Sequence, residues 1–424
     1  MYTFDQIIGY AQIKEELRQL CDMMHHLDVY DRLGANMPKG LLLHGEPGVG
    51  KSLMAQSLVQ ESGRKAYIIR RSKPDGDFIN EIKRVFTEAA VNTPSIILLD
   101  DMDKYVVEED SREEYVAVQA CMDEVKSNDV YVVATANDLR DIPDSLLRAG
   151  RFDRKIFVGL PKSEESVEII RHYLSSKNVE SGLRTEDIAK MLSGKSCADL
   201  ETLLNEAAIY AGFTRCETIT MEHIVRSVLR NEYGVTDFGL PIDPSRIENT
   251  AYHEAGHAVV SELLLPGSVG LVSLRARGGS DQDDGFMIRC VDCQLPSQDV
   301  LISLAGHAAT EIALGTVSAG TARDLRRAIY RLNESITKNA ASGFGTVDIF
   351  DYYERPSDSM RARQEAMIQA ELEKHAMQAK KMLAENMAFL KAVAAALLEK
   401  ETLLHSDMQK LREAAGVIID GQIW

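Results

Sequence analysis

The stretch GLLLHGEPGVGKS, which runs from Gly40 to Ser52, decides the fold of the first part of the chain. Its first five residues predict a short buried strand, and residues 53–61 behind it have a helical pattern. Between them lies a Gly-x-x-x-x-Gly-Lys-Ser motif, whose glycines let backbone N–H groups approach phosphate oxygens at the positive end of a helix. Strand, glycine-rich turn and helix are the context that this motif requires, so we predict a nucleotide site here.

The phosphate loop is expected to bind the nucleotide through its backbone and its side chains. The residues predicted to contact the nucleotide are Gly45, Glu46, Pro47, Gly48, Val49, Gly50, Lys51 and Ser52. Among them, Lys51 is expected to neutralise the β- and γ-phosphates, and Ser52 to offer its hydroxyl to Mg²⁺.

Two further apolar stretches predict strands that end in polar residues. Residues 94–101 end in Asp100 and Asp101, and residues 130–136 are followed by Asn137. We expect Asp100 to hold magnesium through water, Asp101 to polarise the attacking water, and Asn137 to contact the γ-phosphate or that water. Three apolar strands separated by helical segments predict a doubly wound parallel α/β sheet, in which ligands gather at the carboxyl ends of the strands.

The segment after these strands combines a basic turn with a helical region. Arg148 and Arg151 lie three residues apart beside a glycine. They form either a solvated basic turn or a pair of arginine fingers that reach the γ-phosphate of a neighbouring subunit. Residues 163–230 have helical patterns and no strand pattern, and the glycines and prolines between positions 234 and 244 predict a linker.

A second motif, His-Glu-x-x-His, lies within Tyr252 to Val260. Residues four apart share one face of a helix, so His253 and His257 can bind one metal ion from the same side. Two neutral imidazoles suit zinc, and Glu254 lies beside them, where a base is needed to deprotonate metal-bound water. The motif fixes only three residues, so two ordinary histidines on an amphipathic helix are the alternative.

Composition narrows the class of protein. The 424 residues carry a net charge of −17, which disfavours non-specific binding to nucleic acid. No segment approaches the apolar length of a membrane span, the first residues lack a signal-peptide pattern, and six cysteines fit a reducing compartment. We therefore expect a cytoplasmic protein. The lone Cys-x-x-Cys at Cys290 and Cys293 is read as two incidental thiols, with a structural zinc or redox role as the alternative.

Along nearly its whole length the chain resembles the FtsH-type AAA+ zinc metalloproteases, which contain a peptidase domain of family M41. The landmarks that carry the resemblance are Tyr30 to Gly34, Pro38 to Gly40, the phosphate loop, Asp100 and Asp101, Asn137, Leu146 to Arg154, Ala198 to Ala208, His253 to His257, Leu304 to Gly315, Thr321 to Leu325, and Leu397 to Leu403. They occur in the order in which the family has them.

The resemblance implies an α/β P-loop AAA+ domain with a helical lid, followed by a mainly α-helical zinc peptidase domain. The predicted boundaries are 1–160 for the AAA+ domain, 161–234 for the lid, 235–247 for a linker and 248–424 for the peptidase domain. It further implies a homo-hexamer that uses ATP, Mg²⁺ and Zn²⁺ to unfold and degrade damaged or unfolded proteins. In such a ring Arg148 and Arg151 are expected to act as arginine fingers.

The third zinc ligand also follows from the resemblance. A catalytic zinc usually has three protein ligands and a water. A metzincin would place glycine and histidine where Val260 and Leu263 stand, so that class is excluded. Of the downstream acids, Glu311 and Asp324 are the chief candidates, and Asp324 matches the ligand aspartate of the family.

Three features depart from the family pattern. Its members normally carry membrane spans before the ATPase domain, and none is found here. Asp101 stands where the family has a glutamate, so its carboxylate is one methylene shorter and slow ATP hydrolysis is expected. The aromatic-hydrophobic-glycine triplet of the pore loop is missing between Arg70 and Asn80. Phe78 is the nearest equivalent, and packing of Phe78 in the core is the alternative.

Two other functions remain as alternatives to the ATP-dependent protease. One is an ATP-driven protein-remodelling machine with a weak or vestigial peptidase site, and the other is a peptidase whose ATPase unit only assembles the ring. The complete set of His253, Glu254, His257 and Asp324 argues against the first. The complete phosphate loop and the two arginine fingers argue against the second.

Overall fold

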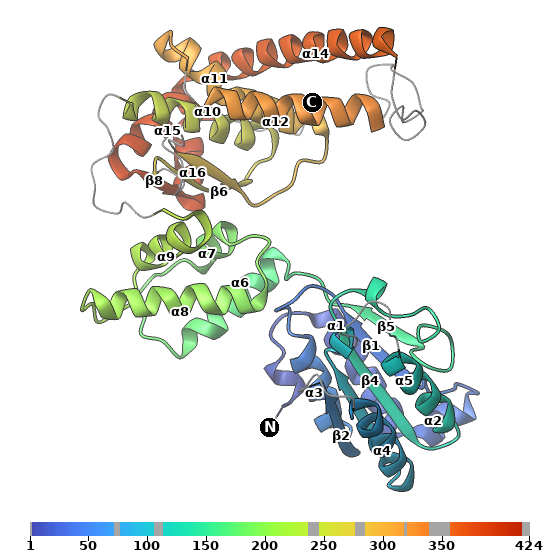
Figure 1. Ribbon diagram of the computed structural model, residues 1–424. Coiled ribbons are helices and arrows are strands. Elements are labelled where there is room, and N and C mark those ends of the chain that lie inside the picture. Colours follow the sequence, from blue (N-terminus) through green and yellow to red (C-terminus); the bar gives the residue numbers. More distant parts are fainter. Residues whose placement is uncertain are drawn as a thin grey trace. The chain divides into compact units, whose positions relative to one another are not determined.

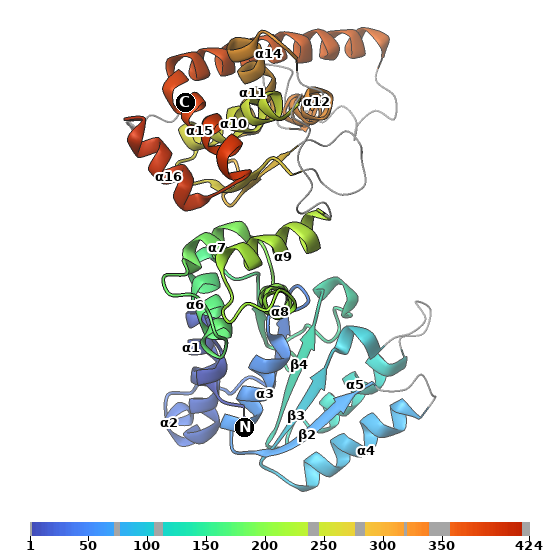
Figure 2. The ribbon, with the colours of Figure 1, turned by 90° about the vertical axis from the view of Figure 1, so that its left-hand side faces the viewer.

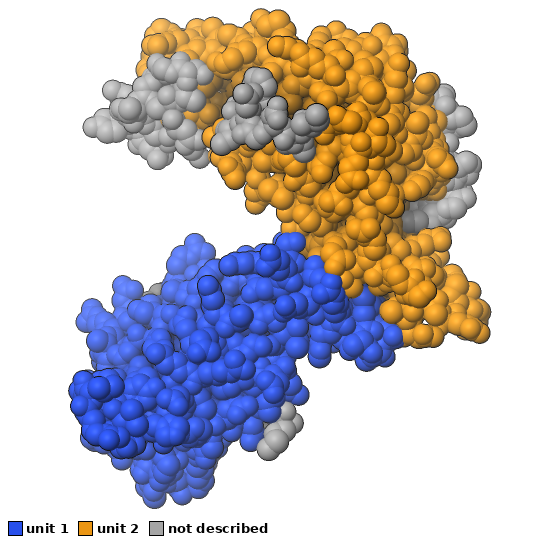
Figure 3. Space-filling view, turned by 180° about the vertical axis from the view of Figure 1, so that it is seen from behind, with its two compact units in different colours: residues 1–177, 194–205 blue, residues 178–193, 206–424 orange. Residues whose placement is uncertain are grey.

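The computed structural model describes residues 2–71, 77–105, 113–235, 246–275, 285–317, 320–338 and 357–417. The chain forms two compact units (Figure 3). Unit 1 comprises Met1–Lys177 and Gly194–Asn205, and unit 2 comprises Asn178–Ser193 and Glu206–Trp424. Helix α8 (Cys197–Phe213) therefore begins in unit 1 and ends in unit 2.

Unit 1 is built on a five-stranded parallel sheet with the order β2-β3-β4-β1-β5 (Figure 1). The strands are β1 (Gly40–His44), β2 (Lys65–Arg70), β3 (Ser95–Asp100), β4 (Val130–Ala136) and β5 (Arg154–Phe157). The three apolar stretches predicted as strands are the central three, and nearly all of their residues are buried because helices cover both faces. The edge strand β5 was not predicted, because it is short and mostly exposed.

Helices cover both faces of this sheet (Figure 2). Helices α4 and α5 lie on one face, and α3, with α1 packed against it, lies on the other. The helices of unit 1 are α1 (Ala11–His25), α2 (Leu27–Arg32), α3 (Lys51–Glu61), α4 (Phe78–Val91), α5 (Glu113–Glu124) and α6 (Ser163–Ser175), with 3-10 helices η1 (Phe4–Gln6), η2 (Met102–Tyr105) and η3 (Leu139–Asp141). Helices α1 and α2 are separated by His26, whose φ of −126° and ψ of 43° are not helical.

Phe78 belongs to the core of unit 1. It is 4% exposed, and its ring lies edge-on to Tyr105, with 4.9 Å between the ring centroids. The structure therefore supports the packing alternative for Phe78 and not a role in gripping substrate. The rest of the candidate pore-loop region includes residues 72–76, which lie outside the described residues.

Unit 2 combines helices of the predicted lid with those of the predicted peptidase domain. Its helices, besides the end of α8, are α7 (Thr185–Met191), α9 (Met221–Tyr233), α10 (Ile247–Leu264), α11 (Pro296–Leu314), α12 (Thr321–Lys338), α14 (Asp358–Glu385), α15 (Met387–Lys400) and α16 (His405–Ala414). Helix α11 packs against α10, α12 and α14. The predicted linker contains residues 236–245, which lie outside the described residues. In the described part of the chain, no helix is both long and apolar enough to cross a membrane.

A small antiparallel sheet was missed by the sequence analysis. It has the order β7-β6-β8 and is formed by β6 (Val269–Ser273), β7 (Phe286–Arg289) and β8 (Thr402–Leu404). Strand β8 lies between α15 and α16, in a domain that was expected to be mainly helical. Strands of three to five residues are too short to show a periodic pattern.

A buried carboxylate joins helix α7 to helix α16 within unit 2. Asp187 is 1% exposed and accepts hydrogen bonds from Ser406 N (2.9 Å) and Ser406 Oγ (2.7 Å). Ser406 lies in the first turn of α16, whose N–H groups have no partners within the helix. Asp187 therefore satisfies a helix end that is buried between the lid and the peptidase region.

Replacing Asp187 by alanine should lower the thermal midpoint of unit 2. The substitution leaves a buried N–H and a buried hydroxyl without an acceptor, which costs on the order of 1–3 kcal/mol. Differential scanning calorimetry of Asp187→Ala measures the change, with Glu186→Ala, the exposed neighbour, as the control. Equal midpoints for both variants would contradict this account.

Candidate nucleotide and metal sites

The phosphate loop lies between β1 and α3 in a conformation that needs glycine. Gly50, the residue before α3, has a φ of 100°, and Gly45 has a φ of 147°. Both angles are disfavoured for residues with a Cβ. A Cβ on Gly45 would also collide with the carbonyl oxygen of Val158. The loop therefore turns tightly from the sheet into α3 and leaves the N-terminus of that helix open to an anion.

Lys51 and Asn137 are connected at the carboxyl edge of the sheet. Lys51 is 6% exposed, and its Nζ donates hydrogen bonds to Gly45 O (2.7 Å), Glu46 O (2.8 Å) and Asn137 Oδ1 (3.0 Å). Burial lowers the pKa of the Lys51 ammonium. The side chain of Asn137 is fixed from its other end, because its Nδ2 donates to Asp103 Oδ2 (2.7 Å).

Asp100 lies at the end of β3 and is fully buried. Its Oδ1 accepts hydrogen bonds from Ser52 Oγ (2.9 Å) and from Thr135 Oγ1 (2.8 Å), and its Oδ2 pairs with Arg70. Burial acts to raise the pKa of Asp100, but the hydrogen bonds from Arg70 and the two hydroxyls hold it below its ordinary value. An ionised carboxylate directly behind Ser52 suits a magnesium site.

Asp101 follows Asp100 with a φ of 53°, in the left-handed region. Its backbone N–H donates to Thr135 Oγ1 (2.8 Å), and its carboxylate pairs with Lys104 Nζ (2.8 Å). Asp101, Lys104 and Asn137 line the same cavity as the phosphate loop. Asp101 is therefore at the cavity, but a cation already engages its carboxylate.

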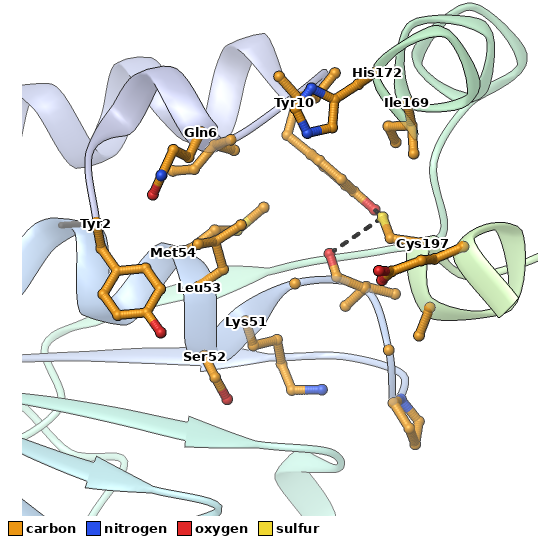
Figure 4. Close-up of a pocket in the computed structure, with 18 of the residues that line it drawn as sticks. Tyr2, Gln6, Tyr10, Lys51, Ser52, Leu53, Met54, Ile169, His172 and Cys197 are labelled. Carbon is orange, nitrogen blue, oxygen red and sulfur yellow. Dashed lines mark hydrogen bonds between the residues drawn. The ribbon is translucent and has the colours of Figure 1, made fainter. Parts of the chain in front are cut away.

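This cavity in unit 1 has a volume of about 710 Å³ (Figure 4), within the range of ligand pockets. One end is polar and is formed by the phosphate loop. The other end is lined by Ile7, Tyr10, Ile169 and His172, which provide the apolar and aromatic surface that a flat base requires. Sequence reasoning missed this end, because its residues come from distant segments that share no motif.

Arg148 and Arg151 do not line this cavity in the described part of the chain. Arg148 is exposed, and Arg151 pairs with Asp123 (2.7 Å). Neither is among the described residues that line the nucleotide cavity of its own chain. Both predicted roles, the basic turn and the arginine fingers, are compatible with this placement.

Three side chains converge in unit 2. His253 and His257 lie one turn apart on α10, and Asp324 lies in the first turn of α12. Asp324 Oδ2 is 3.0 Å from His253 Nε2 and 3.2 Å from His257 Nε2, and the two Nε2 atoms are 3.1 Å apart. Glu311, the other candidate ligand, is 43% exposed and pairs with Lys380.

The triangle formed by these three atoms fits zinc. Tetrahedral coordination with bonds of about 2.0–2.1 Å places ligand atoms roughly 3.3 Å apart, close to the distances between the three atoms here. Burial acts to raise the pKa of Asp324, but the two histidines hold it well below its ordinary value, so this ligand is anionic. Two nitrogens and one carboxylate are the ligand set of many catalytic zinc sites.

Helix α11 supports this triangle through its backbone. The Ile302 carbonyl accepts a hydrogen bond from His257 Nδ1 (2.6 Å), which leaves the lone pair of Nε2 for a metal. Gly306 lies against the imidazoles, since a Cβ there would be 2.5 Å from His257 Nε2. His253 Nδ1 is buried without a hydrogen-bond partner in the described structure.

Glu254 lines a cavity of about 210 Å³ together with the three converging side chains. It is 4% exposed, and Gly285, with a φ of 90°, lies close to its side chain. A Cβ on Gly285 would be 2.8 Å from Glu254 Cγ. The carboxylate is therefore packed tightly at the site where a water bound to the metal would need a base.

The segments that carry the two candidate sites match two known protein families. Residues 41–160 match the ATPase family associated with various cellular activities (AAA), and residues 241–411 match peptidase family M41. An ATP-dependent zinc metalloprotease FtsH of Leptotrichia buccalis is 31% identical over 96% of this chain and 56% of its own length. The FtsH of Caldicellulosiruptor bescii is also 31% identical, over 96% of this chain and 72% of its own length.

This chain belongs to the FtsH family of ATP-dependent zinc metalloproteases. A third relative, FtsH 2 of Thermoanaerobacter sp., is 27% identical over 97% of this chain and 83% of its own length. The chain thus covers a little over half of the length of the Leptotrichia buccalis protein and most of the length of the other two relatives. The AAA match covers the phosphate loop and Asp100, and the M41 match covers the zinc triangle.

Some residues of these FtsH-type sites were not predicted. Thr135 contacts both Asp100 and Asp101, but it lies inside an apolar strand and follows no motif. Ile302 contributes a backbone carbonyl, which no side-chain pattern reveals. Gly306 could have been recognised from the sequence, because glycine is uncommon inside helices and often indicates close packing of a neighbouring element.

Gly306→Ala should abolish or strongly weaken zinc binding. Its methyl group would occupy the space beside His257 Nε2 and 2.6 Å from His253 Cε1, so the imidazoles must move apart. Metal analysis after dialysis measures zinc per chain, and ATPase activity in unit 1 should be unchanged. Gly212→Ala is the matched control, because a Cβ there has no atom within 4 Å. Full zinc retention by Gly306→Ala would contradict the geometry.

Asp101→Glu should raise the rate of ATP hydrolysis. The longer side chain reaches further into the cavity, and a misplacement of about 1 Å can cost on the order of 10²-fold in rate. Steady-state phosphate release compares it with the wild type and with Asp101→Asn, which should be slower than both. An equal or lower rate of ATP hydrolysis in the glutamate variant would show that the shorter side chain of Asp101 does not limit hydrolysis.

Proposed function

We propose that this chain is an ATP-dependent zinc endopeptidase that unfolds and degrades proteins. The observation that carries the proposal is the triangle of His253, His257 and Asp324, with edges of 3.0–3.2 Å, beside Glu254 in the same cavity. The same chain carries a nucleotide cavity with a buried Lys51 and Asp100. Family membership supports the combination of the two activities.

In the peptidase site, three side chains hold the metal and a fourth moves the proton. A zinc ion held there supplies Lewis acidity, which polarises a peptide carbonyl and makes a water molecule more acidic. Glu254 accepts the proton of the attacking water and passes it to the leaving amine. Ile302 fixes the tautomer of His257, so that its Nε2 stays available to the metal.

In the nucleotide site, the backbone of residues 45–50 and Lys51 bind the phosphates. Ser52 and Asp100 hold magnesium, and Asp101 and Asn137 orient the attacking water. Arg148 and Arg151 contact the nucleotide of a neighbouring subunit, which requires a ring. We propose a homo-hexamer, and native mass spectrometry tests it. A monomer with full ATPase activity would rule out fingers acting between subunits, and a dimer would rule out the hexamer.

Substrates are proposed to be unfolded or damaged proteins. The net charge of −17 supports a protein rather than a nucleic-acid partner. A cytoplasmic location is part of the proposal and is supported by the six free cysteines, which suit a reducing compartment. Cell fractionation tests the location directly.

Casein cleavage should require both ATP and Glu254. Glu254→Gln should lower the cleavage rate by at least about 10²-fold, because it removes the base. Its ATPase rate should stay at the wild-type value. The assay measures fluorescent casein with and without ATP, and Glu311→Gln, an exposed acid in α11, is the matched control.

The same assay separates the alternatives. Cleavage that survives in Glu254→Gln would point to another peptidase in the sample and would leave a remodelling ATPase. Cleavage that proceeds at full rate without ATP would leave a peptidase whose ATPase unit only assembles the ring. Loss of cleavage both in Glu254→Gln and on removal of ATP supports the proposed enzyme.

A further inference from the structure

Asp299 is a buried acid that no motif predicted, and it lies beside the metal cavity. It is 4% exposed and belongs to the start of α11. Its Oδ1 accepts hydrogen bonds from Arg289 (2.8 Å) and Arg327 (3.2 Å), and its Oδ2 accepts one from Arg331 Nε (2.8 Å). Three guanidinium groups thus meet on one carboxylate inside the peptidase region.

The partners of Asp299 come from two different walls of the metal cavity. Arg289 ends strand β7, and Arg327 and Arg331 lie on α12. Arg289, Asp299 and Arg327 themselves line the cavity that holds the zinc triangle. One carboxylate of α11 therefore ties β7 and α12 to the helix that also supports His257.

The first turn of α12, which carries Asp324, has no buried apolar residue. Residues 322, 323 and 325–327 are exposed, and Ala328 is the first buried residue of this helix. Asp324, Arg327 and Arg331 follow one another at intervals of three and four residues, so they share one face of the helix. Further along α12, Ala328 and Leu332 pack in an apolar cluster with residues of α11. The contacts of Arg327 and Arg331 with Asp299 add polar ties beside this cluster, close to the turn that bears Asp324.

The contact is also strong enough to position a helix. Burial acts to raise the pKa of Asp299, but the adjacent arginines, Arg327 and Arg289 foremost, hold it below its ordinary value. Hydrogen bonds between an ionised carboxylate and guanidinium groups are about twice as strong as neutral ones. Two of the three arginines are about half exposed, so the carboxylate is the buried partner of each pair.

We propose that Asp299 is a positioning residue of the zinc site, which sets the rotation and depth of α12 so that Asp324 meets the two imidazoles. This inference rests on the proposed zinc site. Asp299 acts through Arg327 and Arg331 and does not contact the metal. Asp299 and Ile302 lie three residues apart on α11 and therefore on the same face of this helix. Asp299 supports Asp324 through α12, and Ile302 supports His257 directly.

The test measures zinc affinity by competition with a chromophoric chelator, for the full chain. Asp299→Asn keeps the shape of the side chain and removes its charge, and zinc affinity should fall by about 10- to 100-fold, as for other groups that orient metal ligands. ATPase activity and the circular dichroism of the zinc-free protein should match the wild type. Glu311→Gln, an acid of the same helix that pairs with Lys380, should keep wild-type affinity.

A second pair of variants covers the case in which Asp299→Asn does not fold. Arg331→Gln changes a side chain that is 45% exposed, and it should lower zinc affinity several-fold. Glu334→Gln removes the other partner of Arg331 (3.2 Å) and should leave zinc affinity unchanged. In the double variant Asp299→Asn with Arg331→Gln, the loss should be no greater than for Asp299→Asn alone, because both changes remove one contact.

The outcomes separate this inference from the proposed function. A wild-type chain that binds no zinc would overturn both. If the wild type binds zinc and folded Asp299→Asn or Arg331→Gln binds it equally well, only the positioning role of Asp299 is wrong. Equal losses in Arg331→Gln and Glu334→Gln would also overturn it, because the effect would then not depend on Asp299.

Discussion

The close approach of α10 and α11 is the constraint on which the peptidase site depends. A Cβ on Gly256 would lie 2.5 Å from the Ala305 carbonyl oxygen, and one on Gly306 would lie equally close to His257 Nε2. Gly256 of α10 therefore leaves room for the backbone of α11, and Gly306 of α11 leaves room for an imidazole of α10. Because the helices meet at this distance, both imidazoles are buried between them, and the Ile302 carbonyl reaches His257.

In the nucleotide site, a parallel sheet brings together side chains that are distant in the sequence. Parallel strands end at one edge, so side chains that follow β3 and β4 meet beside the phosphate loop. Asp100 is held there by hydroxyls from two elements, Ser52 of α3 and Thr135 of β4. In both sites a carboxylate has a fixed orientation before any cation binds, and preorganisation of this kind reduces the cost of binding.

The parts of both sites that are contiguous in the chain could be predicted from the sequence. The phosphate loop and His253 with His257 follow local motifs whose geometry is set by one turn or one helix. Asp324 lies far from His253 in the chain, and its role came from the resemblance to the family. Contacts that depend on packing, such as the Ile302 carbonyl with His257, could not be predicted, because nothing in the sequence specifies which helices meet.

The difference between local patterns and contacts made by packing also explains which strands were missed in the sequence analysis. The central strands were found because burial on both faces makes them continuously apolar. The short strands β6, β7 and β8 were missed because three to five residues give too little periodicity to separate strand from loop. Phe78 shows the limit of the resemblance. Its position suggested a pore loop, but its ring packs against Tyr105, and this contact depends on the local sequence.

Of the three contacts in the zinc triangle, the two made by the Asp324 carboxylate are favourable, and the one between the two histidines depends on what lies between them. Two neutral imidazoles whose Nε2 atoms are 3.1 Å apart direct their lone pairs toward each other, and this arrangement is unfavourable unless a proton or a cation lies between them. The packing of α10 on α11 and the contacts of Asp299 hold the three groups together regardless. The fold therefore supplies the arrangement of the three groups, and a cation bound between the two imidazoles would supply the attraction that they lack when both are neutral.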